Sequence, residues 1–246
     1  MTLRRISAAL MLALATPHAS AAQAHAPREW ALWAGAAALF AGSVLLDRTI
    51  ESGVPDGGGT RYEWASDRLN YLGRPQYAVV ALAGTYAAGR LAHAPKTAQA
   101  AEHVAIALLA SGVANGAVKF AAGRERPSFT DDPHRFKPFS RQDRWQSFPS
   151  GHAVVAFSLA ASISEEARKP WVTALAYGTA SLVGWSRVYE DRHWTSDVVG
   201  GGLIGIAASR YTIHRLHAHR ARGDSAAAAG VAISPLPGGV MVSIAR

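Results

Sequence analysis

The order of apolar and polar positions along the chain indicates six helices. Six segments are mainly apolar, rich in alanine and glycine, and end in polar residues. They lie at Trp30–Leu46, Tyr77–Ala92, His103–Val118, Ala153–Ile163, Trp171–Val188 and Val198–Ile213. The segments are too long for ordinary strands, and their small residues let helix backbones approach closely. The sequence therefore predicts an all-α fold, a bundle of about six apolar helices that cross a membrane.

The charges near these segments leave the setting of the bundle open. The first segment contains no charged residue and is the best candidate for a membrane span. Arg90, Glu102 and His103 lie at the edges of the next two segments. Edge charges of this kind fit a membrane interface and a soluble bundle equally well.

The N-terminus has the pattern of a cleaved secretory signal. Two arginines precede a short apolar run, Ile6–Ala15, and small residues follow at A-x-A spacing up to Ala21. An uncleaved anchor is the weaker interpretation, because the run is shorter than the roughly 20 residues that a span needs. We therefore expect a signal peptide at residues 1–21, a helical catalytic domain at 22–218 and a tail at 219–246.

Composition and charge narrow the chemistry. The chain has no cysteine, which excludes disulfides, thiolate nucleophiles and cysteine-bound zinc. A formal net charge of +8 favours an anionic partner: nucleic acid, anionic lipid headgroups or a phosphorylated substrate. A basic binding protein without enzymatic activity would account for the charge, but it would leave the histidines described below unexplained. No element typical of nucleic-acid recognition is evident.

Two long connectors and a basic flank lie outside the apolar segments. Residues 51–75 form a predicted connector rich in glycine and mixed charge, with Pro75 placed to start the next helix. The second connector, Phe120–Phe148, holds six lysines and arginines and is the predicted wall of an anion site. His214, His217 and His219 follow the last segment, where a solvated basic face is a better interpretation than a metal cluster.

Three short motifs lie where an apolar helix meets a polar loop. They are KFAAGRERP at Lys119–Pro127, PSGH at Pro149–His152 and SRVYEDRHWTSD at Ser186–Asp197. Each has an ordinary structural explanation when taken alone, as solvated cations, as a helix start, or as a metal pair or structural hydrogen bond. In PSGH, however, Ser150 can cap a helix, and Gly151 lets a ligand approach free backbone N–H groups.

The third motif carries the most specific signal. His193 and Asp197 are four residues apart, which in a helical segment places both side chains on one face. A carboxylate that binds one imidazole nitrogen leaves the other free as a nucleophile or base. Together with His152, Lys119, Arg126 and Arg187, the pair supplies the positive charge, nucleophile and proton donor that phosphoryl transfer requires.

The ordered pattern KxxxxxxRP, PSGH and SRxxxxxHxxxD, within residues 104–210, resembles the phosphatidic acid phosphatase type 2 and vanadium haloperoxidase superfamily. The resemblance implies that His193 attacks phosphorus, that Asp197 orients it, and that His152 protonates the leaving alkoxide and then activates water. It also implies that the phosphate oxygens are bound by Lys119, Arg126, Ser150, Gly151 and Arg187. Arg124 is a second candidate for this contact, although the motif spacing favours Arg126. No metal or cofactor is expected in the reaction.

The predicted function is a metal-independent phosphatase that hydrolyses phosphate monoesters or pyrophosphates of lipids through a phosphohistidine. A soluble periplasmic acid phosphatase and a vanadium haloperoxidase of the same superfamily are the alternatives. We expect the protein in the inner membrane with a periplasmic active site, or in the periplasm, and leave its oligomeric state open. A cleaved signal followed by six spans would turn the motifs toward the cytoplasm. A cleaved signal and six spans are therefore incompatible with a periplasmic active site. The prediction is that residues 120–148 face the periplasm.

Overall fold

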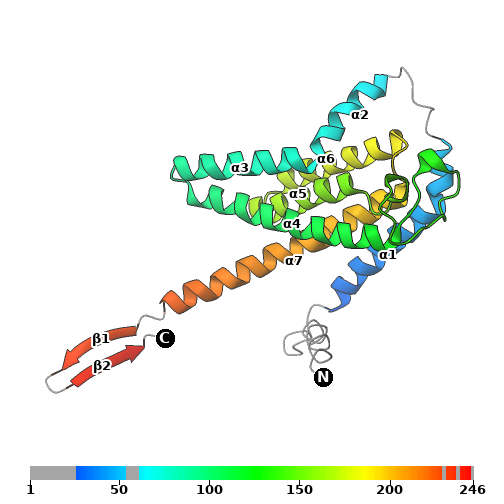
Figure 1. Cartoon of the computed structure of the whole chain (residues 1–246). Coiled ribbons are helices and arrows are strands. Elements are labelled where there is room, and N and C mark those ends of the chain that lie inside the picture. Colours follow the sequence, from blue (N-terminus) through cyan, green and yellow to red (C-terminus); the bar gives the residue numbers. More distant parts are fainter. Residues whose placement is uncertain (1–25, 54–60, 229–230, 237–238, 245–246) are drawn as a thin grey trace, which may run out of the picture. The chain divides into compact units, whose positions relative to one another are not determined.

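The computed structural model describes residues 26–53, 61–228, 231–236 and 239–244, which are mainly helical (Figure 1). The chain divides into two compact units between Ala38 and Leu39, inside the first helix, and the second unit contains all the active-site residues. The predicted signal peptide lies outside the described residues. The helices are α1 Ala26–Glu51, α2 Arg61–Leu72, α3 Pro75–Leu91, α4 Pro95–Ala122, α5 Gly151–Ala167, α6 Pro170–Tyr189 and α7 Thr195–Ala228.

The predicted helical bundle is confirmed. Each of the six apolar segments corresponds to one of the described helices, namely α1, α3, α4, α5, α6 and α7. Pro75, Pro95 and Pro170 occupy first-turn positions of their helices, where the missing N–H costs no intrahelical bond. After α7, strands β1 Val231–Leu236 and β2 Gly239–Ile244 form an antiparallel pair. The predicted boundary between domain and tail, after residue 218, falls inside α7.

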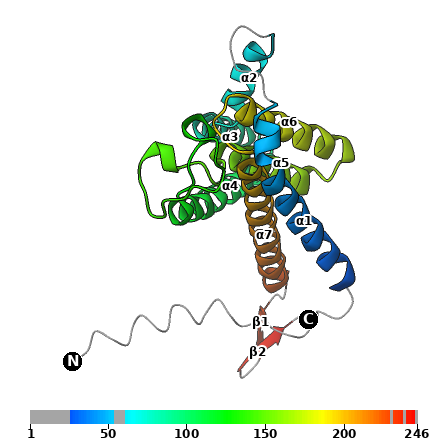
Figure 2. The ribbon, with the colours of Figure 1, turned by 90° about the vertical axis from the view of Figure 1, so that its right-hand side faces the viewer.

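Helix α5 lies among α4, α6 and α7 and packs against all three (Figure 2). Small residues allow the close contact with α7: a β-carbon at Gly201 would lie 2.6 Å from the Ser150 carbonyl oxygen, and one at Gly205 would lie 2.6 Å from that of Val154. Side chains larger than hydrogen are therefore excluded from this interface. Close packing of α7 on α5 fixes the start of α7 beside the start of α5.

The prediction that residues 51–75 form a connector throughout was wrong, because Arg61–Leu72 forms α2. This helix lacks the long apolar run of the other six, because charged residues interrupt it, and it packs against α6. The buried Ser66 hydroxyl donates at 2.8 Å to the carboxylate of Glu190, which lies at the end of α6. The second connector agrees with its prediction after Ala122, where α4 ends. It contains two short 3-10 turns, at Pro127–Phe129 and Asp143–Trp145, and an isolated bridge between Arg124 and Phe136.

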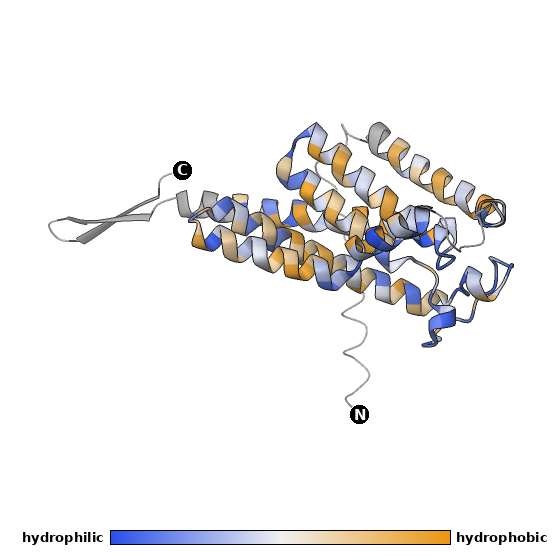
Figure 3. Ribbon diagram, turned by 90° about the horizontal axis from the view of Figure 1, so that it is seen from above, coloured by the Kyte–Doolittle hydropathy of each residue, from blue (hydrophilic) through white to orange (hydrophobic). Residues whose placement is uncertain are grey.

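Hydrophobic residues run along the helices and polar residues gather at helix ends and in loops (Figure 3). Among the described residues, Trp30–Glu51 and Pro95–Ala122 are long and apolar enough to cross a membrane. Large apolar side chains also point outward from other helices, with Val80 70%, Leu109 70% and Leu175 65% exposed. The outer surface of the bundle is therefore apolar over several helices.

Candidate active site

The three sequence motifs meet at one end of the bundle. Lys119 lies in the last turn of α4, His152 in the first turn of α5 and Asp197 in the first turn of α7. The Ser150 N–H donates to the Asp197 carbonyl at 2.9 Å, which joins the second motif to the third. Arg126 Nη1 lies 3.5 Å from His193 Nε2, which joins the first motif to the third. Residues separated by up to 78 positions thus share one site.

His193 lies in the turn before α7 and is 5% exposed. The N–H groups of Arg192 and His193 both donate to the Arg187 carbonyl, at 3.1 and 3.2 Å, which fixes this turn on the end of α6. His193 Nδ1 faces Asp197 Oδ2 at 3.7 Å, and Nε2 faces Arg126. The helical spacing on which the pairing was predicted does not apply, because α7 begins at Thr195. The turn itself brings the two side chains together.

Asp197 is fully buried and belongs to a network of hydrogen bonds. Its Oδ1 accepts from Arg124 at 2.7 Å, and its Oδ2 accepts from the Ser147 hydroxyl at 2.5 Å and the Trp194 N–H at 2.9 Å. Burial alone would raise the pKa of Asp197, but His193, the Arg124 charge and the Ser147 hydroxyl together hold this pKa below its usual value. Asp197 is therefore an anion with a fixed orientation next to His193.

The structure separates the roles of Arg124 and Arg126, which the sequence left open. Arg124 is 3% exposed, and its guanidinium donates to Asp47 of α1 at 2.8 Å as well as to Asp197. Asp47 also accepts from the N–H and the hydroxyl of Ser196, at 2.8 and 2.5 Å. Arg124 is thus a buried link between two carboxylates, and Arg126 is the arginine that reaches His193.

The three predicted phosphate-binding cations are held in place by protein acceptors. Lys119 Nζ donates to the Gln146 carbonyl at 2.5 Å. Arg126 binds the Arg192 carbonyl at 3.0 Å and Asp143 Oδ1 at 2.9 Å. Arg187 donates to Asn70 of α2 and to Glu190, while its buried Nε has no hydrogen-bond partner in the described part of the chain. The cations are therefore oriented before any anion binds.

Ser150 and Gly151 start α5, as the sequence predicts. Ser150 is the N-cap residue, and its hydroxyl accepts from the Ala153 N–H at 3.5 Å. The N–H groups at the first turn of a helix have no intrahelical acceptor, so the amides of Gly151 and His152 are available by position. This helix start adds backbone donors to the end of the bundle where the cations lie.

His152 lies half-buried against α2 and among positive charges. A β-carbon at Gly73 would lie only 2.7 Å from His152 Cδ2, so the chain passes directly over the ring. His152 and His193 both lie outside the two candidate membrane spans. Burial lowers the pKa of His152 to about 3, with the positive charges of Arg187 and others adding to the effect. Burial likewise lowers the pKa of His193 to about 4, although Asp197 opposes this. Both rings are neutral at neutral pH.

Comparison with known proteins identifies the family of the helical domain. The model of the PAP2 superfamily matches residues 101–221, which include all three motifs. These residues form a PAP2 superfamily domain. The resemblance predicted from the motifs is thereby confirmed.

Relatives of the PAP2 domain include lipid phosphatases. The chain is 37% identical over 100 residues to the lipid A 1-phosphatase of Porphyromonas gingivalis, which covers 40% of this chain and 19% of that protein. It is 41% identical over 59 residues to the undecaprenyl-diphosphatase of Sulfolobus acidocaldarius, covering 24% of this chain and 28% of that protein. The matches thus span less than a third of either relative.

A solved structure shares the fold. The transmembrane PAP2-type phosphatidylglycerolphosphate phosphatase of Bacillus subtilis superposes with a TM-score of 0.57 and 20% identity, over 76% of this chain and 96% of that protein. At this identity the likeness concerns the fold of the bundle. It supports a helical architecture that is also found in a transmembrane protein.

Several residues around the site of the PAP2 domain were not predicted from the sequence. Asp47 accepts from Arg124, and Ser147 donates to Asp197. Asn70 of α2 accepts from Arg187, and Gly73, just after α2, lies against His152. None of these residues belongs to one of the three motifs. Their roles depend on contacts between distant parts of the chain, for which the sequence contains no spacing signal.

Proposed function

We propose that this chain is a phosphatase that transfers the phosphoryl group of a lipid phosphate to His193 and then to water, without a metal ion in the reaction. The observation that carries the proposal is the buried, neutral His193, with Nδ1 beside Asp197 and Nε2 beside Arg126. Asp197 favours the ring proton on Nδ1, so the lone pair lies on Nε2, and a bound phosphate takes over the long Arg126 contact and frees this lone pair for attack on phosphorus. The nearby cations stabilise the negative charge of the phosphoryl group.

The first step forms a bond from His193 Nε2 to phosphorus and breaks the bond from phosphorus to the leaving oxygen. A bound phosphate dianion offsets the positive charge around His152, which raises the pKa of this ring so that it takes up a proton. His152 returns the proton to the leaving oxygen. In the second step His152 accepts a proton from water while the water oxygen attacks phosphorus, and free His193 and inorganic phosphate result.

The cations and the start of α5 bind the three equatorial oxygens of the phosphoryl group. Lys119, Arg126 and Arg187 are already oriented by protein acceptors, so little reorganisation is needed in the transition state. The backbone donors of Gly151 and its neighbours complete this cradle. Asp197 is a poor ligand for Mg²⁺, because Arg124, Ser147 and the Trp194 amide already occupy its two oxygens.

The surroundings of the site favour a lipid substrate. A groove of about 720 Å³ lies between α3 and α4, and most of its lining is apolar, including Val79, Leu82 and Leu109. It begins at Pro75, directly after Arg74, whose charge acts on His152. The two candidate spans and the outward apolar side chains support a membrane setting. The lipid phosphatases among the relatives support the same substrate class.

A phosphate-release panel tests this function. Purified full-length protein is assayed with phosphatidate, phosphatidylglycerol phosphate, undecaprenyl pyrophosphate, lipid A and a soluble aryl phosphate. We expect at least one lipid to be hydrolysed much faster than the aryl phosphate. In the same assay, His193→Ala should lose activity. Its matched control is His134→Ala, which should retain activity because His134 is an exposed histidine of the second connector. Preference for the aryl phosphate, or full activity of His193→Ala, would contradict the proposal.

We further propose that residues 120–148 face the periplasm, where an exported phosphatase meets its substrates. A reporter that is active only in the periplasm, fused within this connector, should be active. The same reporter fused in the cytoplasm provides the control. A connector that is protected from protease outside the cell membrane and labelled from inside would overturn this topology.

A further inference from the structure

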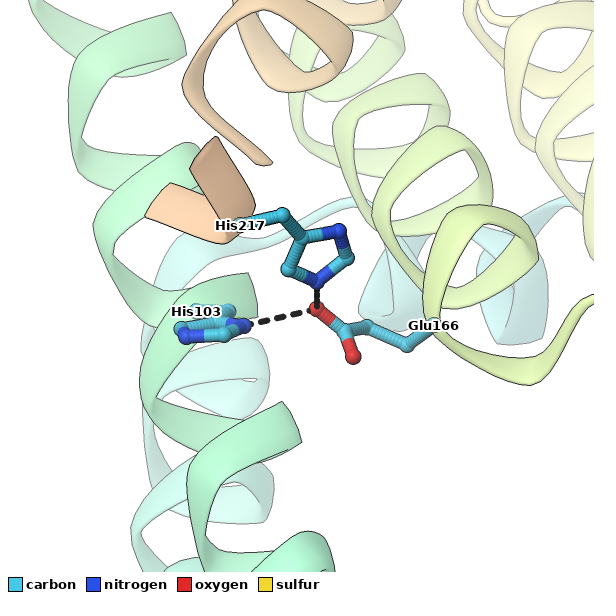
Figure 4. Close-up of side chains that lie close together, drawn as sticks. All are labelled: His103, Glu166 and His217. Atoms are coloured by element: carbon cyan, nitrogen blue, oxygen red, sulfur yellow. Dashed lines mark hydrogen bonds and ion pairs between the residues drawn. The ribbon is translucent and has the colours of Figure 1, made fainter. Parts of the chain in front are cut away.

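A second cluster of polar side chains lies far from the phosphate site. His103 of α4, Glu166 of α5 and His217 of α7 point toward one another (Figure 4). Glu166 Oε1 lies 2.8 Å from His103 Nδ1 and 3.1 Å from His217 Nε2. The rings of the two histidines meet edge to face, with centroids 5.3 Å apart. Three helices thus contribute one side chain each to a single point.

This cluster lies at the opposite end of the bundle from His193. In α4, His103 precedes Lys119 by 16 residues, and in α5, Glu166 follows His152 by 14 residues. At 1.5 Å per residue these separations are about 24 and 21 Å. A ligand bound at the cluster therefore touches neither of the proposed catalytic histidines.

The donor atoms fit a transition-metal ion. Two imidazole nitrogens and one carboxylate oxygen lie within 4.8 Å of one another, so small side-chain rotations bring all three to one ion at about 2.0–2.2 Å. Two histidines and a glutamate are a donor set that zinc uses in proteins. Each ring nitrogen that now faces Glu166 would exchange its proton for the metal.

Charge and exposure around the cluster also suit a cation. Glu166 contributes the negative charge, while its neighbour Glu165 is already paired with Arg210 at 2.9 Å and with His214 at 3.4 Å. His103 is buried, whereas the side chains of Glu166 and His217 are 19% and 31% exposed. An ion can therefore enter from solvent, and water can supply the remaining ligand.

We propose that His103, Glu166 and His217 bind a zinc-like divalent cation that ties α4, α5 and α7 together at this end of the bundle. The site revises the interpretation of the basic flank as wholly solvated. It does not use the three neighbouring histidines together, since His214 pairs with Glu165 instead. The ion is structural, and the proposal does not depend on the phosphatase function.

Zinc titration of the chelator-treated, tag-free protein tests this site. We expect Zn²⁺ to bind with a stoichiometry of one per chain and, at about a hundredfold excess over Kd, to raise the unfolding temperature by roughly 5–10 °C. Co²⁺ should give the visible absorption of a tetrahedral complex. Mg²⁺ should have no effect, because it prefers oxygen ligands in an octahedron.

Variants of exposed or part-exposed residues keep the test independent of folding. His217→Ala and Glu166→Gln should each weaken Zn²⁺ binding at least about tenfold, since even residues outside the ligand set change metal affinity by that factor. The matched control, His214→Ala, should bind Zn²⁺ like the wild type. Absence of stoichiometric Zn²⁺ binding to the wild type, or equal binding by His217→Ala, would overturn the proposal.

Discussion

Replacing Arg124 with methionine should destabilise the protein strongly. Arg124 and its partner Asp47 are buried, with side chains 4% and 0% exposed, and Asp197 on the other side is also fully buried. Methionine has a similar length but leaves two carboxylates without their cation. Removing one partner of a buried ion pair costs about 3–5 kcal/mol, and a chain of this size should then unfold at least roughly 6 °C lower.

Arg126→Met is the matched comparison. The two arginines are two positions apart, and the two substitutions remove the same charge. Arg126 pairs with Asp143, which is 75% exposed, so its loss should change the free energy of unfolding by less than about 1 kcal/mol. Its loss should nevertheless lower kcat/KM about a hundredfold or more, because it removes a donor to the phosphoryl group.

Thermal unfolding followed by circular dichroism in one detergent, combined with phosphate release at saturating and limiting substrate, separates the two effects. We expect a stability defect for Arg124→Met and a catalytic defect for Arg126→Met. An Arg124→Met protein as stable as the wild type, with a raised KM, would show that Arg124 contacts the substrate instead.

Three further predictions concern the histidines and the reaction. His193→Ala should form no phosphoenzyme under alkaline quench. His152→Ala should still form it and should lose most activity with poor leaving groups. Equal losses for good and poor leaving groups would contradict the acid role of His152. Activity should survive EDTA and be inhibited by vanadate, and an EDTA-treated enzyme that requires Mg²⁺ for recovery would refute the metal-independent reaction. Because the folded pKa of His193 is about 4 and that of an unfolded histidine about 6.5, the unfolded chain binds more protons between these values. The free energy of unfolding should therefore fall as pH drops from 6.5 to 4, and denaturant midpoints should show a smaller fall in His193→Gln.

Much of the fold could be predicted from the sequence, because a long apolar segment predicts a helix without information from the rest of the chain. The exception was α2, which is interrupted by charged residues and whose Ser66 is fixed by Glu190 at the end of α6. Likewise, the basic flank appeared solvated when considered alone. The position of His217 beside Glu166 depends on how α7 packs on α5.

The sequence by itself determined the helical bundle, the family and the residues proposed for catalysis, since each rests on hydropathy or on spacing within a short motif. The motif spacing favoured Arg126 over Arg124, but only the tertiary structure showed that Arg126 faces His193 and that Arg124 is buried between two carboxylates. The role of Arg124 depends on Asp47, 77 residues before it, whose buried carboxylate accepts from the guanidinium. Burying a charge is costly without a partner. The position of that partner is set by helix packing, which no local pattern in the sequence records.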